Sequence, residues 1–340
     1  MTDLWTYLKS VKKPIVLYGT GDGADKIYNR LLKDNIKISG VFASDGFKKG
    51  KTAYGFTVTS YSELKEKFNE MIILVCFGSH LDDVIENILR LEKDNELYLP
   101  DVPVCDGEVF DLSFAKKHKD ELLMVYNMLS DNKSKKVFEN TVYFKLTGKS
   151  CYLREIESDR DEVFSLLSLK GENFLDLGAF NGDTVEEFIK HCPDYKNIMA
   201  VEPDFRNFKK LSENTKEVKN ITLINKAVSN KIGVINISKN KGRGNSLSGK
   251  TVEIATTTIN EISSFLPTFI KMDVEGAELS AISGGEEVLK HKPKLHIAAY
   301  HRSEDIFTLP LKIKELCPAY KIYMRKHKAL PAWDINYIFI

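Results

Sequence analysis

Apolar and polar positions alternate in two separate stretches of the chain, and each stretch predicts a run of strands and helices. In the first stretch, strands are expected at about 15–19, 36–43, 71–77 and 96–99, and helices at about 23–33, 60–68 and 80–93. The runs Ile38–Ala43 and Met71–Phe77 are almost continuously apolar, as strands buried on both faces are. We therefore predict a parallel sheet with helices on both faces.

The second stretch repeats this pattern and ends differently. Strands are expected at about 173–178, 197–202, 221–225, 232–238, 268–273, 294–300, 320–325 and 335–340. The last two lie too close together for a crossover helix, so we expect them to pair as an antiparallel hairpin. The prediction is a mostly parallel α/β sheet closed by an antiparallel terminal strand.

A chain of 340 residues is long enough for two domains, each with its own core. We place the first domain at 1–110 and the second at 151–340, and we expect the charged segment 111–150 to be a helical connector. Both domains begin with an apolar strand, a glycine turn and a helix, at 15–24 and 173–184.

Composition and charge exclude several classes of function. Apolar residues make up 43% of the chain and charged residues 29%, as in soluble proteins, and no apolar run approaches a membrane span. With a net charge of +1 and interspersed signs, we expect no nucleic-acid partner. No secretory signal is visible, so a cytoplasmic location is expected. The cysteines form no C-x-x-C pair, which favours incidental thiols over disulfides or zinc: Cys76, Cys105, Cys151, Cys192 and Cys317.

The strongest chemical signal is the glycine turn after the strand that ends near Leu177. Gly178 and Gly182 allow the backbone to turn sharply and to approach a ligand, just before a helix begins near Asp183. The acid Asp176 precedes the first glycine, where it would repel a pyrophosphate but attract an ammonium or a sulfonium. The turn therefore favours S-adenosylmethionine over NAD.

Further polar residues follow the next strands. Glu202, about 20 residues after Gly182, is placed to accept hydrogen bonds from ribose hydroxyls. The third strand ends at Asn225–Val228, where the loop could cover an adenine. The acids Asp273 and Glu275 follow the buried strand at 268–273, at the edge where open α/β sheets bind ligands. A third acid, Glu278, is interpreted as a helix N-terminal residue.

Taken together, the segments 174–184, 201–203, 225–228 and 270–278 resemble the FkbM family of methyltransferases, in order from about residue 143 to the C-terminus. The resemblance implies a class I, Rossmann-like methyltransferase fold, S-adenosylmethionine as methyl donor, and transfer to an oxygen, often of a sugar or another secondary metabolite. The expected donor-binding residues are Asp176, Gly178, Ala179, Asn181, Gly182, Asp183, Thr184, Glu202, Pro203, Ala227 and Asp273.

The acceptor hydroxyl needs a base, and two residues are candidates. His301 follows the strand at 294–300, and the ordinary pKa of histidine suits a base near neutrality. Asp273 is the alternative base. No metal site is assigned, although Asp273 and Glu275 could also bind a divalent ion. Glu275, Arg243 and Ser246 are expected near the acceptor, the last two in a loop that is either a lid or a flexible connection.

The first domain has a weaker glycine motif of its own. Gly19, Gly21 and Gly23 lie between a strand and a helix, and Asp45 lies where a ribose-binding acid would be expected. This smaller Rossmann-like domain is interpreted either as a site for a nucleotide or nucleotide-sugar, or as a sheet used for packing or for a homodimer.

Three functions are compared. The first is an S-adenosylmethionine-dependent O-methyltransferase acting on a hydroxyl of a sugar, glycan precursor or similar metabolite. The second is a nucleotide-sugar oxidoreductase that uses the N-terminal glycine loop, but no Tyr-x-x-x-Lys or equivalent group accompanies that loop. The third is a non-catalytic binding protein, which the retained acids Asp176, Glu202 and Asp273 argue against.

Overall fold

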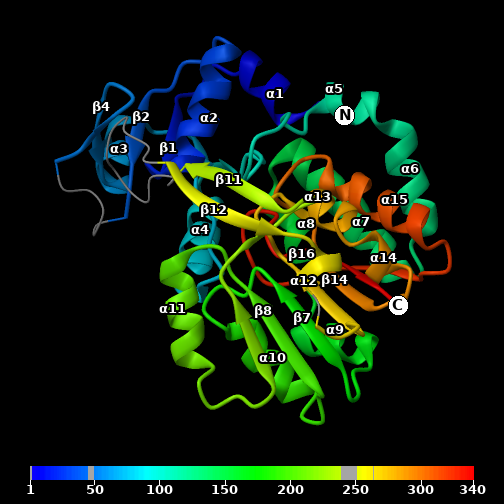
Figure 1. Cartoon of the computed structure of the whole chain (residues 1–340). Helices are drawn as coiled ribbons and strands as arrows, with labels where there is room; N and C mark the ends of the chain where they lie inside the picture. Colours follow the sequence, from blue (N-terminus) through cyan, green and yellow to red (C-terminus); the bar gives the residue numbers. More distant parts are fainter. Residues whose placement is uncertain (1, 45–49, 239–250, 263) are drawn as a thin grey trace.

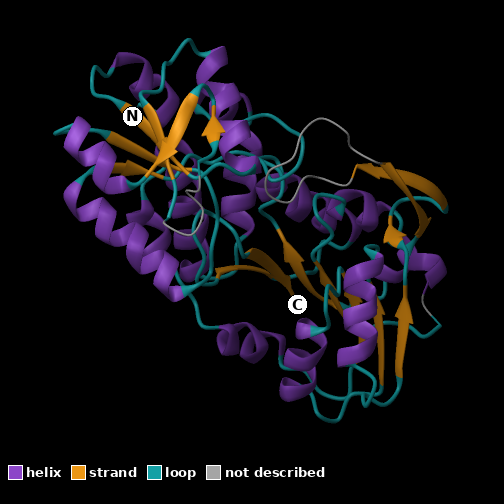
Figure 2. Cartoon of the chain, turned by 90° about the vertical axis from the view of Figure 1, so that its left-hand side faces the viewer, coloured by secondary structure: helices purple, strands orange, loops and turns teal. Residues whose placement is uncertain are grey.

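The structure is a computed structural model that describes all residues except 1, 45–49, 239–250 and 263. Its strands form three sheets within the described residues, two of them large and parallel in most of their pairs. Figures 1 and 2 show the two large sheets at opposite ends of the chain's fold, each flanked by helices.

The first sheet has the order β3-β4-β2-β1-β5-β6. The bounds are β1 Ile15–Tyr18, β2 Gly40–Phe42, β3 Thr52–Ala53, β4 Phe56–Thr59, β5 Ile72–Val75 and β6 Glu96–Tyr98. All neighbours are parallel except β3 and β4, which form a short antiparallel hairpin that the sequence pattern did not indicate. The connecting helices are α2 Asp22–Lys33, α3 Tyr61–Lys67 and α4 Asp82–Asp94, and α1 Leu4–Ser10 precedes the sheet.

Helices follow the first sheet, as expected for 111–150. They are α5 Leu112–Lys117, α6 Lys119–Met128, α7 Asn132–Thr147, α8 Ser150–Arg154 and α9 Arg160–Leu167. Aspartates cap α5 and α7, because Asp111 and Asp131 each accept a hydrogen bond from a backbone N–H of the first turn. Gly148, with φ +65°, ends α7 in the left-handed conformation that helix C-termini favour.

The second large sheet has the order β15-β16-β14-β13-β7-β8-β9. The bounds are β7 Asn173–Leu177, β8 Asn197–Val201, β9 Ile221–Ile224, β13 Phe269–Met272, β14 Lys294–Ala298, β15 Ile322–Lys326 and β16 Ile335–Phe339. The predicted terminal hairpin is confirmed, since β15 and β16 are antiparallel. However, β16 also pairs with β14, so the antiparallel strand lies inside the sheet and β15 forms its edge. The order is thus the doubly wound 3-2-1-4-5-6 with one inserted strand.

The helices of this half are α10 Asp183–His191, α11 Phe205–Asn214, α12 Ile259–Ile262, α13 Glu278–Ser283, α14 Glu286–Leu289 and α15 Asp305–Leu316. Together with the sheet order, they confirm the predicted mixed α/β class.

A small third sheet, of order β10-β12-β11, differs from the expected pattern. It contains β10 Ala227–Val228, β11 Gly233–Ser238 and β12 Thr251–Thr257. The strand expected at 232–238 does form, but it pairs antiparallel with β12 and not with the large sheet. Its side chains give the reason: Val234 is 62% exposed, whereas the parallel strands of the large sheets are buried on both faces.

One buried apolar cluster crosses the boundaries that the sequence suggested. It contains Val16 of β1, Phe144 of α7 and Leu175 of β7, so the two large sheets and the connecting helices share a core. Trp333, between β15 and β16, packs directly against Gly78 of the first half of the chain, so closely that a Cβ on Gly78 would lie only 2.4 Å from the Trp333 ring. The division at 110 and 150 remains a prediction about folding units.

Candidate active site

The polar residues predicted from the sequence meet at one edge of the seven-stranded sheet. β7, β8, β13 and β14 are parallel neighbours, so their carboxyl ends lie side by side. The glycine turn 178–182, Glu202, Asp273 and Tyr300–His301 directly follow these four strands. This is the edge at which open α/β sheets bind their ligands.

The glycine turn is held against the end of β13. Gly178 has φ +83°, and a Cβ at this position would lie 1.8 Å from the carbonyl oxygen of Asp273, so only glycine fits. Phe180 has φ +47° and is 48% exposed, an unusual backbone conformation for an aromatic residue. Gly182, with φ +93°, precedes α10, where the N–H of Asp183 donates to Asn181 Oδ1 at 3.3 Å and that of Thr184 donates to Asp183 Oδ1 at 2.8 Å.

Asp176 lies beneath the turn and not at its surface. Its side chain is fully buried, and neither carboxylate oxygen has a hydrogen-bond partner among the described residues. Lys271 on the adjacent strand supplies the opposite charge, with Nζ 3.5 Å from Asp176 Oδ1 and 3.0 Å from the Gly178 carbonyl oxygen, to which it donates. Burial raises the pKa of Asp176 to about 6, although Lys271 acts against that shift. In the structure the charge partner of Asp176 is Lys271, and the expected contact of Asp176 with a cationic ligand remains a prediction.

Glu202 joins two loops of the edge. Its Oε2 accepts a hydrogen bond from the N–H of Phe180 at 2.9 Å, and its Oε1 accepts one from the N–H of Asp204 at 2.8 Å. Burial raises the pKa of this carboxyl, and the two N–H groups act against the shift. A carboxylate has about four acceptor positions, so these two N–H groups and the Asn207 side chain do not use all of them.

The loop after β9 lies against the loop that carries Glu202. The Asn225 side-chain amide donates to the carbonyl oxygens of Glu202 and Pro203, at 2.8 and 3.1 Å. Ala227 is buried in β10 and pairs with Thr256 of the small sheet. The order of these loops along the edge is thus the one expected, turn first, then Glu202, then the segment 225–228.

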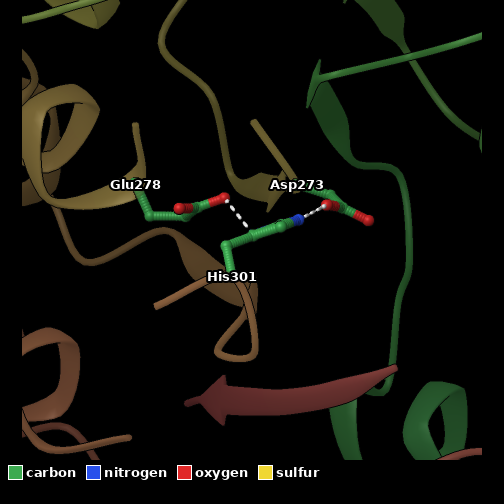
Figure 3. A group of neighbouring side chains, drawn as sticks. All are labelled: Asp273, Glu278 and His301. Carbon is green, nitrogen blue, oxygen red and sulfur yellow. Dashed lines mark ion pairs between the residues drawn. The ribbon is translucent and has the colours of Figure 1, made fainter. Parts of the chain in front are cut away.

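Three side chains form a line across the ends of β13 and β14 (Figure 3). The His301 ring lies between two carboxylates, with Nδ1 3.0 Å from Glu278 Oε1 and Nε2 3.3 Å from Asp273 Oδ1. Glu275 Oε2 lies 3.6 Å from the same Nε2. The Tyr300 hydroxyl lies 3.3 Å from both carboxylate oxygens of Asp273. Asp273 is 32% exposed at its side chain and His301 only 1%, so Asp273 is the member that faces a ligand.

These carboxylates change the acid–base behaviour of His301. Burial alone would lower its pKa, but Glu278, Asp273 and Glu275 together raise the pKa of His301 to about 9. Without a bound ion, the ring therefore favours the protonated form at neutral pH, in which it cannot act as a base. The expectation that His301 titrates near neutrality is therefore wrong for this arrangement, because it took no account of three carboxylates around one ring.

Not all of the predicted residues come to this edge. Asp45, Arg243 and Ser246 lie outside the described residues. Gly19, Gly21 and Gly23 belong to the turn after β1 of the other sheet, where Gly19 has φ +115°. A Cβ on Gly23 would lie 2.5 Å from the carbonyl oxygen of Cys76, so this glycine allows close packing of α2 on β5, while Gly21 faces open space. The five cysteines are free thiols in the structure.

The sequence pattern did not predict the contacts of two charged neighbours. Lys271 lies within the segment 270–278, and its place inside a buried strand is the signal that could have found it, because a buried lysine needs a charged partner. Glu278 does begin α13, as expected, but it is also fully buried and its Oε1 accepts from the Val274 N–H at 2.9 Å. Its contact with His301 could not be found from spacing, since the two residues lie on different elements.

Residues 176–325 match the family profile described as the methyltransferase FkbM domain. The chain carries an FkbM methyltransferase domain. The match covers the whole edge from Asp176 to His301, so the predicted enzyme class, a methyltransferase, is confirmed. Residues 11–96 match a second profile, described as C2185-like, N-terminal.

Solved structures agree with the FkbM assignment in fold. The methyltransferase FkbM from Methylobacillus flagellatus is 23% identical, with a TM-score of 0.72, over 96% of this chain and 90% of its own. A precorrin-6y C5,15-methyltransferase from Geobacter metallireducens is 16% identical, over 54% of this chain and 86% of its own, with a TM-score of 0.34. Fibrillarin from Aeropyrum pernix is 14% identical, over 53% and 74%, with a TM-score of 0.32. The last two are too distant to support a conclusion.

A comparison with curated proteins finds no match. In the described part of the chain, no helix combines the length and hydropathy that crossing a bilayer requires.

Proposed function

We propose that this enzyme transfers the methyl group of S-adenosylmethionine to a hydroxyl oxygen of a sugar, glycan precursor or similar metabolite. The observation that carries the proposal is the partly exposed carboxylate of Asp273, next to the glycine turn and 3.3 Å from Nε2 of the buried His301. A hydroxyl is a poor nucleophile until a base takes its proton, and this edge offers such a base beside the expected donor position. A cytoplasmic location and a saccharide acceptor remain predictions.

The donor is proposed to lie over the glycine turn, with its ribose at Glu202. The Glu202 carboxylate would accept the ribose hydroxyls with the positions that its contacts to Phe180, Asp204 and Asn207 leave unused, and the glycine turn lies directly before the N-terminus of α10. Lys271 neutralises Asp176 beneath the turn, so Asp176 supports the turn from below. The donor's ammonium and sulfonium would then meet the exposed acids of the edge, of which Asp273 is the nearest to the turn through its backbone.

Asp273 is proposed as the proton acceptor. In the step, the acceptor O–H bond breaks and its proton goes to Asp273, the oxygen bonds to the methyl carbon, and the carbon–sulfur bond breaks to leave neutral S-adenosylhomocysteine. His301 and Tyr300 are positioning residues that hold the Asp273 carboxylate from two sides. The enzyme's main contribution is alignment, because the sulfonium donor is already activated.

The test uses donor labelled with ¹³C in its methyl group and a panel of free sugars and nucleotide sugars. We expect an O-methyl carbon signal in one acceptor class, and for Asp273→Asn a turnover lower by roughly a hundredfold with donor affinity almost unchanged. Asp94→Asn, an exposed aspartate at the end of α4, is the matched control. Transfer to nitrogen or carbon only, or full turnover by Asp273→Asn, would refute the proposal.

The N-terminal glycine loop is a separate prediction. A nucleotide or nucleotide-sugar at Gly19–Gly21 would bring a sugar into the same protein as the methyltransferase edge, and the open space at Gly21 is compatible with a ligand. The packing of Gly23 on β5 supports the alternative, in which this sheet serves for packing or for a homodimer.

A further inference from the structure

His301 is a buried side chain whose Nε2 lacks a hydrogen-bond partner among the described residues. The side chain is 1% exposed; its Nδ1 lies 3.0 Å from Glu278 Oε1, whereas Nε2 has only the more distant carboxylate oxygens of Asp273 and Glu275, at 3.3 and 3.6 Å. Glu278 Oε2, in a side chain that is also 1% exposed, lacks a partner as well. Buried polar atoms are normally satisfied, so these atoms indicate that something is missing from this group.

The charges around the ring point in the same direction. Three carboxylates, those of Asp273, Glu275 and Glu278, lie within 3.6 Å of one imidazole. One proton on His301 offsets only part of this negative charge. A divalent cation would offset more of it than a proton does, and would give the ring nitrogen a partner in a geometry that does not require an N–H.

The distances fit ligands of one ion. Asp273, Glu278 and His301 form a compact group, in which one candidate ligand atom of each lies within 4.8 Å of the others, and the distances on the Nε2 side of the ring decide which atoms could share an ion. Two ligands that are about 2.1 Å from an ion, at angles of 90–110°, lie about 3.0–3.4 Å apart. The 3.3 Å between His301 Nε2 and Asp273 Oδ1 is in this range, and the 3.6 Å to Glu275 Oε2 is slightly longer.

We propose that His301 Nε2, Asp273 and Glu275 bind a divalent transition-metal ion, with Glu278 as the carboxylate that orients the ring from its Nδ1 side (Figure 3). A carboxylate at the second nitrogen is the usual arrangement for a metal-bound histidine, since it fixes the ring's orientation. One imidazole and two carboxylates suit manganese, iron or zinc better than magnesium or calcium, which prefer oxygen ligands alone.

The proposed ion faces solvent on one side. Glu275 is 79% exposed and Asp273 32%, whereas His301 and Glu278 close the other side. The backbone of Glu275, with φ +54°, is held in place because the Cys105 thiol donates to its carbonyl oxygen at 2.9 Å. Open coordination positions would therefore point to where an acceptor hydroxyl is expected, and a bound ion lowers the pKa of such a hydroxyl. Only this role of the ion rests on the proposed function; its binding does not.

The test measures binding without donor or acceptor. Full-length protein is stripped with a chelator and titrated with Mn²⁺, and free Mn²⁺ is followed by electron paramagnetic resonance. We expect one saturable ion per chain, with affinity at least tenfold weaker for Glu275→Gln and about 10–100-fold weaker for Glu278→Gln. Glu287→Gln, which removes an exposed carboxylate from α14, is the control and should bind as the wild type does.

Two results would overturn the inference. One is a wild-type protein that binds no Mn²⁺ saturably. The other is a Glu275→Gln protein that binds it as tightly as Glu287→Gln does; Glu275 is exposed, so this variant is expected to fold. Methyl transfer that persists in the stripped protein would leave the proposed function intact and remove the catalytic role of the ion. A protein that binds the ion but transfers no methyl group would keep the proposed ion site and refute the proposed function.

Discussion

Replacing Glu202 by glutamine changes one oxygen of a residue that holds two loops of the donor edge. Both carboxylate oxygens accept a backbone N–H, from Phe180 at 2.9 Å and from Asp204 at 2.8 Å. A glutamine has a single acceptor oxygen, so its NH₂ group must face one of these two N–H donors. The substitution is almost isosteric, which separates the loss of acceptors from any loss of packing.

The magnitude follows from these contacts. A hydrogen bond to a charged group contributes about 1.5–3 kcal/mol, and a buried N–H without a partner costs about 1–3 kcal/mol. If Glu202 also binds the ribose hydroxyls, donor affinity should fall by about 1.5–3 kcal/mol, or about 10–150-fold. The free energy of unfolding should fall by about 1–3 kcal/mol even without a ligand.

Calorimetric titration with S-adenosylhomocysteine and urea unfolding measure these two effects separately. Glu213→Gln, an exposed glutamate on the same helix α11 that follows Glu202, is the matched control and should change neither quantity. A Glu202→Gln protein that loses stability but binds the donor like the wild type would assign Glu202 to loop structure alone. That result would refute its place in the donor site.

Three other substitutions test the edge. Gly178→Ala places a Cβ 1.8 Å from the Asp273 carbonyl oxygen and requires an alanine at φ +83°, so we expect the turn to be displaced. Calorimetry should then show S-adenosylhomocysteine binding at least tenfold weaker, and an unchanged affinity would contradict the tight turn. Lys271→Met leaves Asp176 buried without its cation, and we expect urea unfolding to show a loss of about 3–5 kcal/mol in the free energy of unfolding. The double variant Lys271→Met with Asp176→Asn should restore part of this loss. Additive losses would mean that the two side chains do not interact. The pKa of His301 is raised to about 9 in the folded protein, so its charge stabilises the fold fully below its unfolded pKa of about 6.5, and this stabilisation is lost as the pH rises through about 9. The free energy of unfolding of the wild type, measured with a chelator present, should therefore decrease over this pH range. An equal decrease in His301→Gln would refute the assignment.

Much of the fold could be predicted because parallel strands buried on both faces leave a strong pattern. The strands around Val16, Ile73, Leu175 and Ile270 are apolar at every position but a few, and glycine turns mark where they end. The pattern failed where burial was incomplete. β11 has exposed apolar side chains such as Val234, so its sequence could not indicate that it belongs to a separate antiparallel sheet.

The candidate site could be predicted in position but not in its charge balance. Sequence order placed Glu202 and Asp273 at strand ends, and the topology then brought those ends together. The pairing of Lys271 with Asp176 depends on the register between β13 and β7, and that of His301 with Glu278 depends on how α13 packs beside β14. Such pairings set the pKa of His301, which a lone histidine in a sequence does not reveal.

The central claim is that the carboxyl edge of the seven-stranded sheet binds S-adenosylmethionine. The most direct measurement is calorimetric titration of the full-length protein with S-adenosylhomocysteine and, side by side, with NAD. We predict saturable binding of one S-adenosylhomocysteine per chain that Glu202→Gln weakens at least tenfold, and no displacement of this ligand by NAD. Binding of NAD without any binding of S-adenosylhomocysteine would contradict the account.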